Sequence, residues 1–239
     1  MAQVKPQFGI DAPGVVNTLG FIGVALLALT AICVAINQPA VASLTLWPGC
    51  SMTLASVLML LTSKVGKPWV IRRMIDQLKL RGDEQVLDVG CGRGLLLLDA
   101  ARQLRSGKAT GLDLWSSRDQ SGNTETAARH NVALANLTDR VQIDTGDMRQ
   151  LPYPDAIFDV IISSLAIHNL PGKADREKAV REIVRVLKPG GRLALLDFRH
   201  TSHYVRTLRA SGLGNAKRSW PIFAMFPCVW IVRAGGNDA

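Results

Sequence analysis

Charged residues are missing from one long part of this 239-residue chain. No Asp, Glu, Lys, Arg or His occurs between Asp11 and Lys64, although 20% of the whole chain is charged. A water-exposed segment of that length normally carries charges, whereas the hydrocarbon core of a bilayer excludes them. The uncharged stretch therefore predicts a membrane segment.

Cysteine is also scarce, and its spacing excludes two classes of protein. Four cysteines occur, far apart and in no CxxC or Cys/His pattern: Cys33, Cys50, Cys91 and Cys228. A structural zinc site or a disulfide-stapled miniprotein needs closely spaced cysteines. We therefore expect no metal site, and a core made by ordinary hydrophobic burial.

The uncharged stretch divides into two apolar runs. Residues 14–36 are long enough to cross a hydrocarbon core of about 30 Å as a helix that rises about 1.5 Å per residue. A second run covers residues 40–62, where Pro48 and Gly49 could divide it into a re-entrant piece and a shorter helix. The runs predict a helical hairpin that forms a membrane anchor over residues 1–63. A cleaved signal peptide and a buried hairpin of a soluble protein are the alternatives.

The charges that follow the second run predict the orientation of this anchor. Lys64, Lys67, Arg72 and Arg73 crowd its exit, while the turn between the two runs has no charge. By the positive-inside rule the rest of the protein lies on the cytoplasmic side. Residues 64–83 are expected to form a juxtamembrane helix and linker, because apolar residues recur there at helical spacing: Val70, Ile71, Met74, Ile75 and Leu78.

From Glu84 onward, short β-rich runs alternate with helical stretches, which predicts one α/β domain over residues 84–239. Repeated strand–helix units indicate a doubly wound, Rossmann-like, mostly parallel sheet, here of seven strands. The expected strands are 85–89, 109–114, 141–145, 158–163 and 192–198, and the expected helices 95–105, 124–137 and 174–187. A last helix at 204–213 and a strand pair at 220–226 and 228–232 complete the domain.

The first strand is followed by a turn with three glycines: Gly90, Gly92 and Gly94. Glycines there let the backbone approach a ligand closely. The spacing is GxGxG and not the GxGxxG of dinucleotide-binding proteins, which argues against a nicotinamide dehydrogenase. The second strand ends at Asp113, where doubly wound folds place a carboxylate on a ribose. The polar turn 119–123 either starts the next helix or covers the ligand pocket.

Four motifs in order resemble one known family. They are VLDVGCGRG, GLDLW, TGDMRQLPYPDAIFDVIISSLAIHNL and EIVRVLKPGGRLALLDF. Together they resemble the class I S-adenosylmethionine-dependent methyltransferases, particularly the methyltransferase type 11 group that includes quinone-biosynthesis C-methyltransferases. The resemblance covers about residues 66–198. The apolar hairpin departs from that soluble pattern.

The resemblance implies S-adenosylmethionine as the cofactor and assigns residues to it. The glycine turn, with Cys91 between the first two glycines, would line the methionine part, and Asp88 would reach its amino group. Asp113 would hold the ribose and Leu114 would pack on the adenine. Asp147 would accept a hydrogen bond from the adenine amine, with the Met148 backbone beside it, and the Ser163 carbonyl would meet the methionine ammonium. Singly, Asp88 and Asp147 could instead cap turns.

Methyl transfer is an in-line displacement, so that positioning can supply much of the catalysis. His168 follows the fourth strand at the edge where ligands bind, and is the best-placed general base if the acceptor must lose a proton. A loop histidine without a proton-transfer role is the alternative.

The net charge of +9 bears on the partners of this protein. A basic domain beside an anchor is attracted to anionic headgroups, and a lipophilic small-molecule acceptor in the same membrane is the expected substrate. Aromatic residues make up only 5% of the chain and no RNA-binding motif is visible, so that no nucleic-acid partner is expected. A non-catalytic membrane-attached scaffold that binds S-adenosylmethionine and an RNA methyltransferase are the alternative functions.

Overall fold

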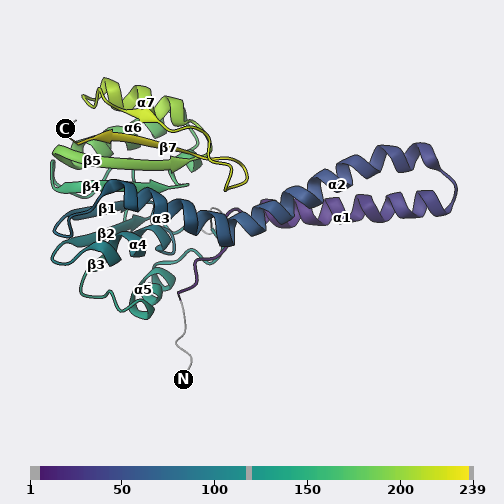
Figure 1. Ribbon diagram of the computed structural model, residues 1–239, viewed down its shortest axis with the longest axis horizontal. Coiled ribbons are helices and arrows are strands. Elements are labelled where there is room, and N and C mark those ends of the chain that lie inside the picture. The colour runs from purple at the N-terminus through teal and green to yellow at the C-terminus, as the bar shows by residue number, and fades with distance from the viewer. Residues whose placement is uncertain (1–5, 117–119, 237–239) are drawn as a thin grey trace.

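A computed structural model describes residues 6–116 and 120–236 of the chain. It consists of an α/β domain and a long helical hairpin that projects from one end of it (Figure 1). The hairpin contains α1 (Pro13–Ala35) and α2 (Pro39–Leu61), each of 23 residues. A proline stands in the first turn of each helix, where its missing N–H leaves no hydrogen bond unmade.

Small and hydroxyl side chains hold the two helices of the hairpin together. The Ser56 hydroxyl donates to the Val16 carbonyl at 2.9 Å, and the hydroxyls of Thr30 and Thr45 lie 2.7 Å apart. Gly23 has no room for a Cβ because Thr53 lies against it. Such close helix packing through small residues is typical of membrane helices.

The second helix is not interrupted at Pro48, which lies inside α2. A π-turn, η1 (Thr62–Gly66), then leads directly into α3 (Lys67–Leu78), so that Pro39–Leu78 forms one helix of 40 residues. The five apolar residues that predicted an amphipathic helix are all buried in α3, packed against the α/β domain, and Trp69 on the other face is exposed. A continuous helix thus joins the hairpin to the domain.

The domain has a seven-stranded sheet in the order β3-β2-β1-β4-β5-β7-β6. β1 to β5 are parallel and β7 is antiparallel to β5 and β6, which confirms the predicted fold class. The strands are β1 (Gln85–Val89), β2 (Lys108–Asp113), β3 (Val141–Thr145), β4 (Phe158–Ser164), β5 (Leu187–Asp197), β6 (Lys217–Arg218) and β7 (Trp230–Gly235).

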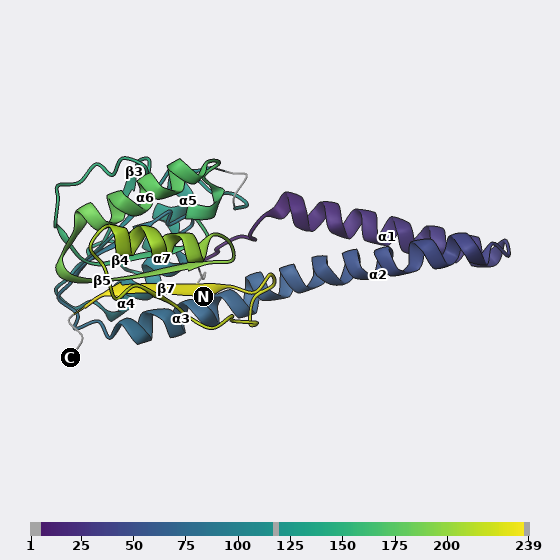
Figure 2. The same cartoon turned by 90° about the horizontal axis from the view of Figure 1, so that it is seen from above.

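Helices cover both faces of this sheet, because alternate strand residues bury apolar side chains on opposite faces. One core packs against α3, α4 (Leu95–Gln103) and α5 (Glu125–Leu134). The other packs against α6 (Lys173–Val186) and α7 (Thr201–Ala210), with the short helix η2 (Ile167–Asn169) after β4. The carboxyl ends of the parallel strands point toward the base of the hairpin (Figures 1 and 2).

The tail of the chain differs from the expected pair of strands. The run 220–226 is not a strand; it belongs to a loop, 219–229, between the two-residue β6 and β7. Only one bridge, between Ile222 and Val229, links the two sides of the loop. Its aromatic side chains are exposed instead of packed on the sheet. The apolar pattern of the sequence cannot distinguish such an exposed apolar loop from a buried strand.

Candidate functional site

The glycine turn after β1 has a backbone that side chains would obstruct. Gly90, Gly92 and Gly94 all have positive φ, of 75°, 51° and 86°. A Cβ on Gly90 would overlap Ala166, and one on Gly92 would lie 2.6 Å from the Gln120 Oε1 atom. Residues with a side chain would therefore be strained or would clash at these positions, so that the turn requires glycine.

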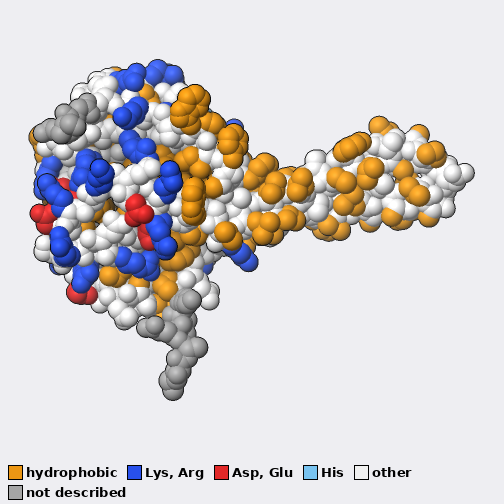
Figure 3. Space-filling view, in the orientation of Figure 1, with side chains coloured by type: hydrophobic (Ala, Val, Ile, Leu, Met, Phe, Trp, Pro, Cys, Tyr) orange, Lys and Arg blue, Asp and Glu red, His pale blue; other side chains and the backbone are white. Residues whose placement is uncertain are grey.

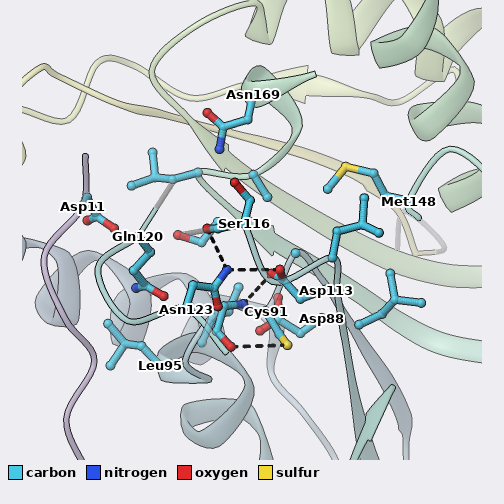
Figure 4. A pocket seen from close by; sticks show the side chains of 18 of the residues that line it. Asp11, Asp88, Cys91, Leu95, Asp113, Ser116, Gln120, Asn123, Met148 and Asn169 are labelled. Atoms are coloured by element: carbon cyan, nitrogen blue, oxygen red, sulfur yellow. Dashed lines mark hydrogen bonds between the residues drawn. The ribbon is translucent and has the colours of Figure 1, made fainter. Parts of the chain in front are cut away.

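A cavity of about 230 Å³ lies over this turn at the carboxyl edge of the sheet (Figure 4). Its floor is formed by residues at or just after the ends of β1 to β4, among them Asp88, Gly90, Cys91, Gly92, Asp113, Leu114, Met148 and Ser164. Its other walls include Asp11, Lys67 and Ile71, which flank the hairpin. The cavity therefore lies where the hairpin joins the domain.

Asp88 is a fully buried carboxyl group on the floor of the cavity. Neither of its oxygens has a well-formed hydrogen bond among the residues that the structure describes, although the Leu97 backbone N–H lies close enough to oppose the rise in its pKa. Burial, with a smaller contribution from the Asp113 charge, raises the pKa of Asp88 well above its ordinary value. An unpartnered buried carboxyl is costly, so that it favours a cationic ligand group in the cavity.

Asp113 ties the end of β2 to the glycine turn. Its Oδ2 accepts a hydrogen bond from the Gly92 N–H at 2.8 Å, and its Oδ1 accepts from the Trp115 N–H at 2.6 Å and from Asn123 Nδ2 at 3.2 Å. A carboxylate has about four acceptor positions, so that at least one remains for a ligand hydroxyl. The polar turn leads directly to Thr124, which caps α5, and its residues Gln120 and Asn123 line the cavity, while its role as a cover over a ligand stays a prediction. Asp119 lies outside the described residues.

Three of the predicted cofactor residues do not line the cavity. Gly94 begins α4 instead. Asp147 is turned toward Arg149, whose Nη2 lies 2.7 Å from its Oδ2 and which lowers the pKa of Asp147. The Ser163 hydroxyl is buried and donates to the Val89 carbonyl at 2.7 Å, whereas its neighbour Ser164 faces the cavity. The roles of Asp147 and Ser163 in cofactor binding therefore stay predictions.

His168 lies beside the cavity and is held by a buried carboxylate. Its Nδ1 atom is 2.8 Å from Oδ1 of Asp197, at the end of β5, although the two groups are not aligned for a hydrogen bond. Asp197 Oδ2 accepts hydrogen bonds from the His168 backbone N–H at 3.2 Å and from the Tyr204 hydroxyl at 3.0 Å. Burial and the Asp197 charge raise the pKa of Tyr204, so that its hydroxyl keeps its proton and donates. Asn169 and Leu170, which follow the histidine, line the cavity.

Comparison with known proteins identifies the domain. Residues 87–195 match the family described as methyltransferase domain, type 11. Over 126 residues the chain is 36% identical to the 27-O-demethylrifamycin SV methyltransferase of Amycolatopsis mediterranei. The matched segment covers 53% of this chain and 43% of that protein. Over 127 residues it is 35% identical to the demethylmenaquinone methyltransferase of Symbiobacterium thermophilum, and this segment covers 53% of this chain and 47% of that protein. The chain thus spans about half the length of these curated relatives.

A solved structure shows the same fold. The S-adenosylmethionine-dependent methyltransferase from Aquifex aeolicus superposes with a TM-score of 0.55 at 20% identity, over 69% of this chain and 88% of that one. Residues 87–195 therefore carry a methyltransferase domain, and the α/β domain has the fold of the S-adenosylmethionine-dependent methyltransferases. The cofactor of this family is S-adenosylmethionine.

The cavity of the methyltransferase domain fits that cofactor. The orphaned oxygens of Asp88 suit the ammonium of its methionine part. The glycine turn leaves space for the methionine part of the cofactor. The remaining acceptor capacity of Asp113 suits a ribose hydroxyl. The residues present therefore meet the charge and the shape of S-adenosylmethionine.

The structure also adds residues to the site that the motifs do not contain. Lys67 Nζ lies 2.7 Å from Asp11 Oδ1, and Ser63 donates to the other oxygen of that carboxylate. Asp11 and Lys67 both line the cavity, and the Lys67 side chain is only 9% exposed. Asp11 is the last charge before the uncharged stretch, and Lys67 lies three residues after Lys64, the first charge that follows it, so that closing a hairpin brings Asp11 and Lys67 near each other. The charges at the two ends of the uncharged stretch were therefore the sequence signal for this contact.

The segment before α1 packs on the methyltransferase domain. Gln7 exchanges two hydrogen bonds with the side chain of Asn131, at 3.0 and 2.8 Å. The Ile10 N–H donates to the Ser121 hydroxyl, and Gln120 donates to the Phe8 carbonyl. Residues 7–11 therefore run along one wall of the cavity before the chain enters the hairpin.

Proposed function

We propose that this protein is a membrane-anchored methyltransferase that moves a methyl group from S-adenosylmethionine to a lipophilic acceptor. The observation that carries the proposal is the place of the cavity. Asp11 and Lys67, which bracket the apolar hairpin, also line the cavity that fits the cofactor. A hairpin embedded in a bilayer would hold this cavity at the membrane surface.

The exposure of the hairpin supports the anchor. Both helices are long and apolar enough to cross a membrane, and only 17% and 11% of their most apolar windows is buried. A hairpin in the core of a soluble protein would bury much more, because apolar side chains on that scale are costly in water. Figure 3 shows hydrophobic side chains along the visible length of the hairpin.

The charges at the base of the hairpin support a cytoplasmic domain. Lys64, Arg72 and Arg73 are exposed there, and the turn Ile36–Gln38 at the far end has no charge. Cytoplasmic loops carry the excess of Lys and Arg in membrane proteins. Carbonate extraction that releases the intact protein would contradict the anchor, and protease protection of the domain in whole cells would support its orientation.

The membrane geometry supports a lipophilic acceptor. A substrate dissolved in the same bilayer reaches a tethered cavity by diffusing in two dimensions, whereas a soluble substrate gains nothing from the tether. The demethylmenaquinone methyltransferase relative bears the name of a quinone precursor with an apolar tail, and the rifamycin relative that of a polyketide. We propose an acceptor of that lipophilic kind.

The residues beside the cavity suggest how the acceptor loses its proton. Bound S-adenosylmethionine supplies a methyl group carried on a positively charged sulfur. A small rotation of the ring would let Nδ1 donate to the Asp197 carboxylate 2.8 Å away, and that hydrogen bond would leave Nε2 as the base. Nε2 of His168 would then take up the proton that the acceptor loses when it is methylated.

A test of this function uses the full chain in lipid nanodiscs with methyl-labelled S-adenosylmethionine. The probe is a demethylated naphthoquinol with an isoprenoid tail, and its matched control has the same ring without the tail. We expect faster labelling of the tailed compound. Equal rates would contradict a membrane-delivered acceptor, and no labelling of any extract together with tight cofactor binding would favour the non-catalytic scaffold.

A further inference from the structure

The loop 219–229, between β6 and β7, exposes apolar side chains without any charge among them. Trp220 is 89% exposed and Phe223 is 79% exposed, and Phe226 is also exposed. Neither the loop nor the strands beside it, residues 217–236, contain an Asp or Glu. Exposed aromatic clusters of this kind mark interaction surfaces on soluble domains.

Contacts fix this loop at the base of the hairpin. The Phe226 N–H donates to the Thr62 hydroxyl at 3.3 Å, and the Ala224 carbonyl fills the space where a Cβ of Gly66 would lie. Met225 and Val229 are buried in the core that contains α3. Both ribbon views place the loop beside the point where α2 gives way to α3 (Figures 1 and 2). The aromatic tips therefore lie level with the end of the apolar span.

Other residues at the same level have the composition of a membrane interface. Trp69 and Val65 are exposed on the helix that continues α2, and the Arg73 guanidinium lies 5.6 Å from the Trp69 ring. At the start of β7, the Trp230 ring has the Arg218 guanidinium 5.2 Å from its centre. Figure 3 shows a band of hydrophobic side chains across the end of the domain that faces the hairpin. Trp residues with flanking cations are typical of the headgroup region.

We propose that the loop 219–229 is a second membrane contact, whose aromatic side chains insert into the bilayer beside the anchor. The inference rests on the proposed membrane anchor and deepens it. The partner is the lipid surface because the loop continues the apolar surface of the hairpin, and because the exposed charges beside it, Lys64, Arg73 and Arg218, are positive and match anionic headgroups.

This contact gives the domain a fixed tilt. The hairpin alone is one attachment, about which a domain can rock, whereas the loop adds a second point on the far side of α3. With both attached, the carboxyl edge of the sheet and the cavity over it are held toward the lipid. Trp220 and Phe223 thus serve acceptor access without lining the cavity.

The test measures tryptophan quenching in the full chain. The protein is placed in nanodiscs whose anionic lipids carry bromine near the top of the acyl chains, and in matched unbrominated discs. Emission is compared for the wild type and for Trp220→Phe, Trp47→Phe and Trp115→Phe. Trp47 reports on the anchor because it is an exposed residue of α2. Trp115 is the control because its indole is partly buried and donates to Thr145.

We expect Trp220 to lose a fraction of its emission similar to that of Trp47, and Trp115 to lose less. Quenching of Trp47 without quenching of Trp220 would overturn the loop contact and leave the anchor intact. Absence of quenching at both would overturn the anchor, and the loop contact with it. An unchanged circular dichroism spectrum of each variant verifies that the Phe substitutions leave the fold unchanged.

Discussion

The cofactor side of the cavity and the side at the base of the hairpin, here called the membrane side after the proposed anchor, are built in different ways. On the cofactor side, Asp88, the glycine turn and Asp113 come from one β–α–β segment, and backbone geometry at two strand ends brings them together. On the membrane side, the Asp11–Lys67 contact joins residues 56 apart, and the Phe226–Thr62 contact joins residues 164 apart. The first side depends on local turns and the second on how the hairpin closes.

The two sides also differ in how their charges are satisfied. Asp88 is buried with no well-formed hydrogen bond among the described residues, whereas Asp11 and Lys67 are paired with each other. A ligand can gain much more from the unpaired group than from the paired ones. Substitutions on the cofactor side should therefore have larger effects on binding than substitutions on the membrane side.

The largest effect is expected for Asp88→Asn. Removing one partner of a buried charge pair costs about 2–5 kcal/mol, so that the dissociation constant of S-adenosylmethionine should rise by about 30-fold or more. Calorimetry on the full chain in nanodiscs measures this. An affinity equal to that of the wild type would show that the ammonium is bound elsewhere.

The same substitution should stabilise the cofactor-free protein. Because burial raises the pKa of Asp88 above its ordinary value of 3.8, the folded protein holds a proton that the unfolded chain has released. The free energy of unfolding then falls as pH rises from that ordinary value through the raised pKa. Thermal unfolding at neutral pH should give a higher Tm for Asp88→Asn than for the wild type, and the difference should shrink at low pH. A lower Tm at neutral pH would contradict this account of Asp88.

Asp113→Ala sharpens the comparison within the cofactor side. The cost of a lost charge-assisted hydrogen bond is about 1.5–3 kcal/mol, which weakens cofactor binding by about 10- to 150-fold. Part of this loss comes from freeing the Gly92 N–H and the Asn123 side chain, which Asp113 now holds. Unchanged affinity in calorimetry would remove Asp113 from the cofactor site.

His168→Ala tests the residue that lies between the two sides. We expect turnover to fall at least about tenfold, at the low end of the range for lost acid–base assistance, with cofactor affinity unchanged. His130→Ala is the matched control because His130 is exposed on α5. Asp197→Asn should lower turnover as well and shift its pH profile, because the histidine tautomer is no longer fixed. If His168→Ala is as fast as the wild type, positioning alone carries the reaction.

The smallest effect is expected for Lys67→Met on the membrane side. The Lys67 charge favours the ionised form of Asp88, so that its loss should weaken cofactor binding by about two- to fivefold. Lys64→Met is the control, because Lys64 is exposed and does not line the cavity. Equal cofactor affinities of the two variants would show that the Lys67 charge does not contribute to cofactor binding.

Most of the fold was predictable because it follows from local patterns. The strands 85–89 and 141–145 were predicted with the bounds that the structure shows, and the glycine turn marked the first crossover. The run 220–226 was wrongly predicted as a strand. Its aromatic residues Trp220, Phe223 and Phe226 face outward beside the hairpin, and a sequence pattern does not reveal which surface an apolar side chain meets.

The site was predictable only where its residues follow strand ends. Asp88 and Asp113 lie where the motifs place them, because the register of β1 and β2 fixes their positions. Arg149 holds the Asp147 side chain away from the cavity, and nothing in the motif reveals that competing partner. The contact between His168 and Asp197 likewise required the pairing of β4 with β5, which brings together two segments distant in sequence.

Transfer of a labelled methyl group tests the central claim most directly. The full chain in its native membrane is incubated with fractionated cell material and with methyl-labelled S-adenosylmethionine, at a concentration well below the dissociation constant of the Asp113→Ala protein, which serves as the reference of low activity. The account predicts that label enters the organic-extractable lipid fraction and that the reference protein produces little of it. Label found only in water-soluble metabolites or in RNA would contradict a membrane-anchored methyltransferase with a lipophilic acceptor.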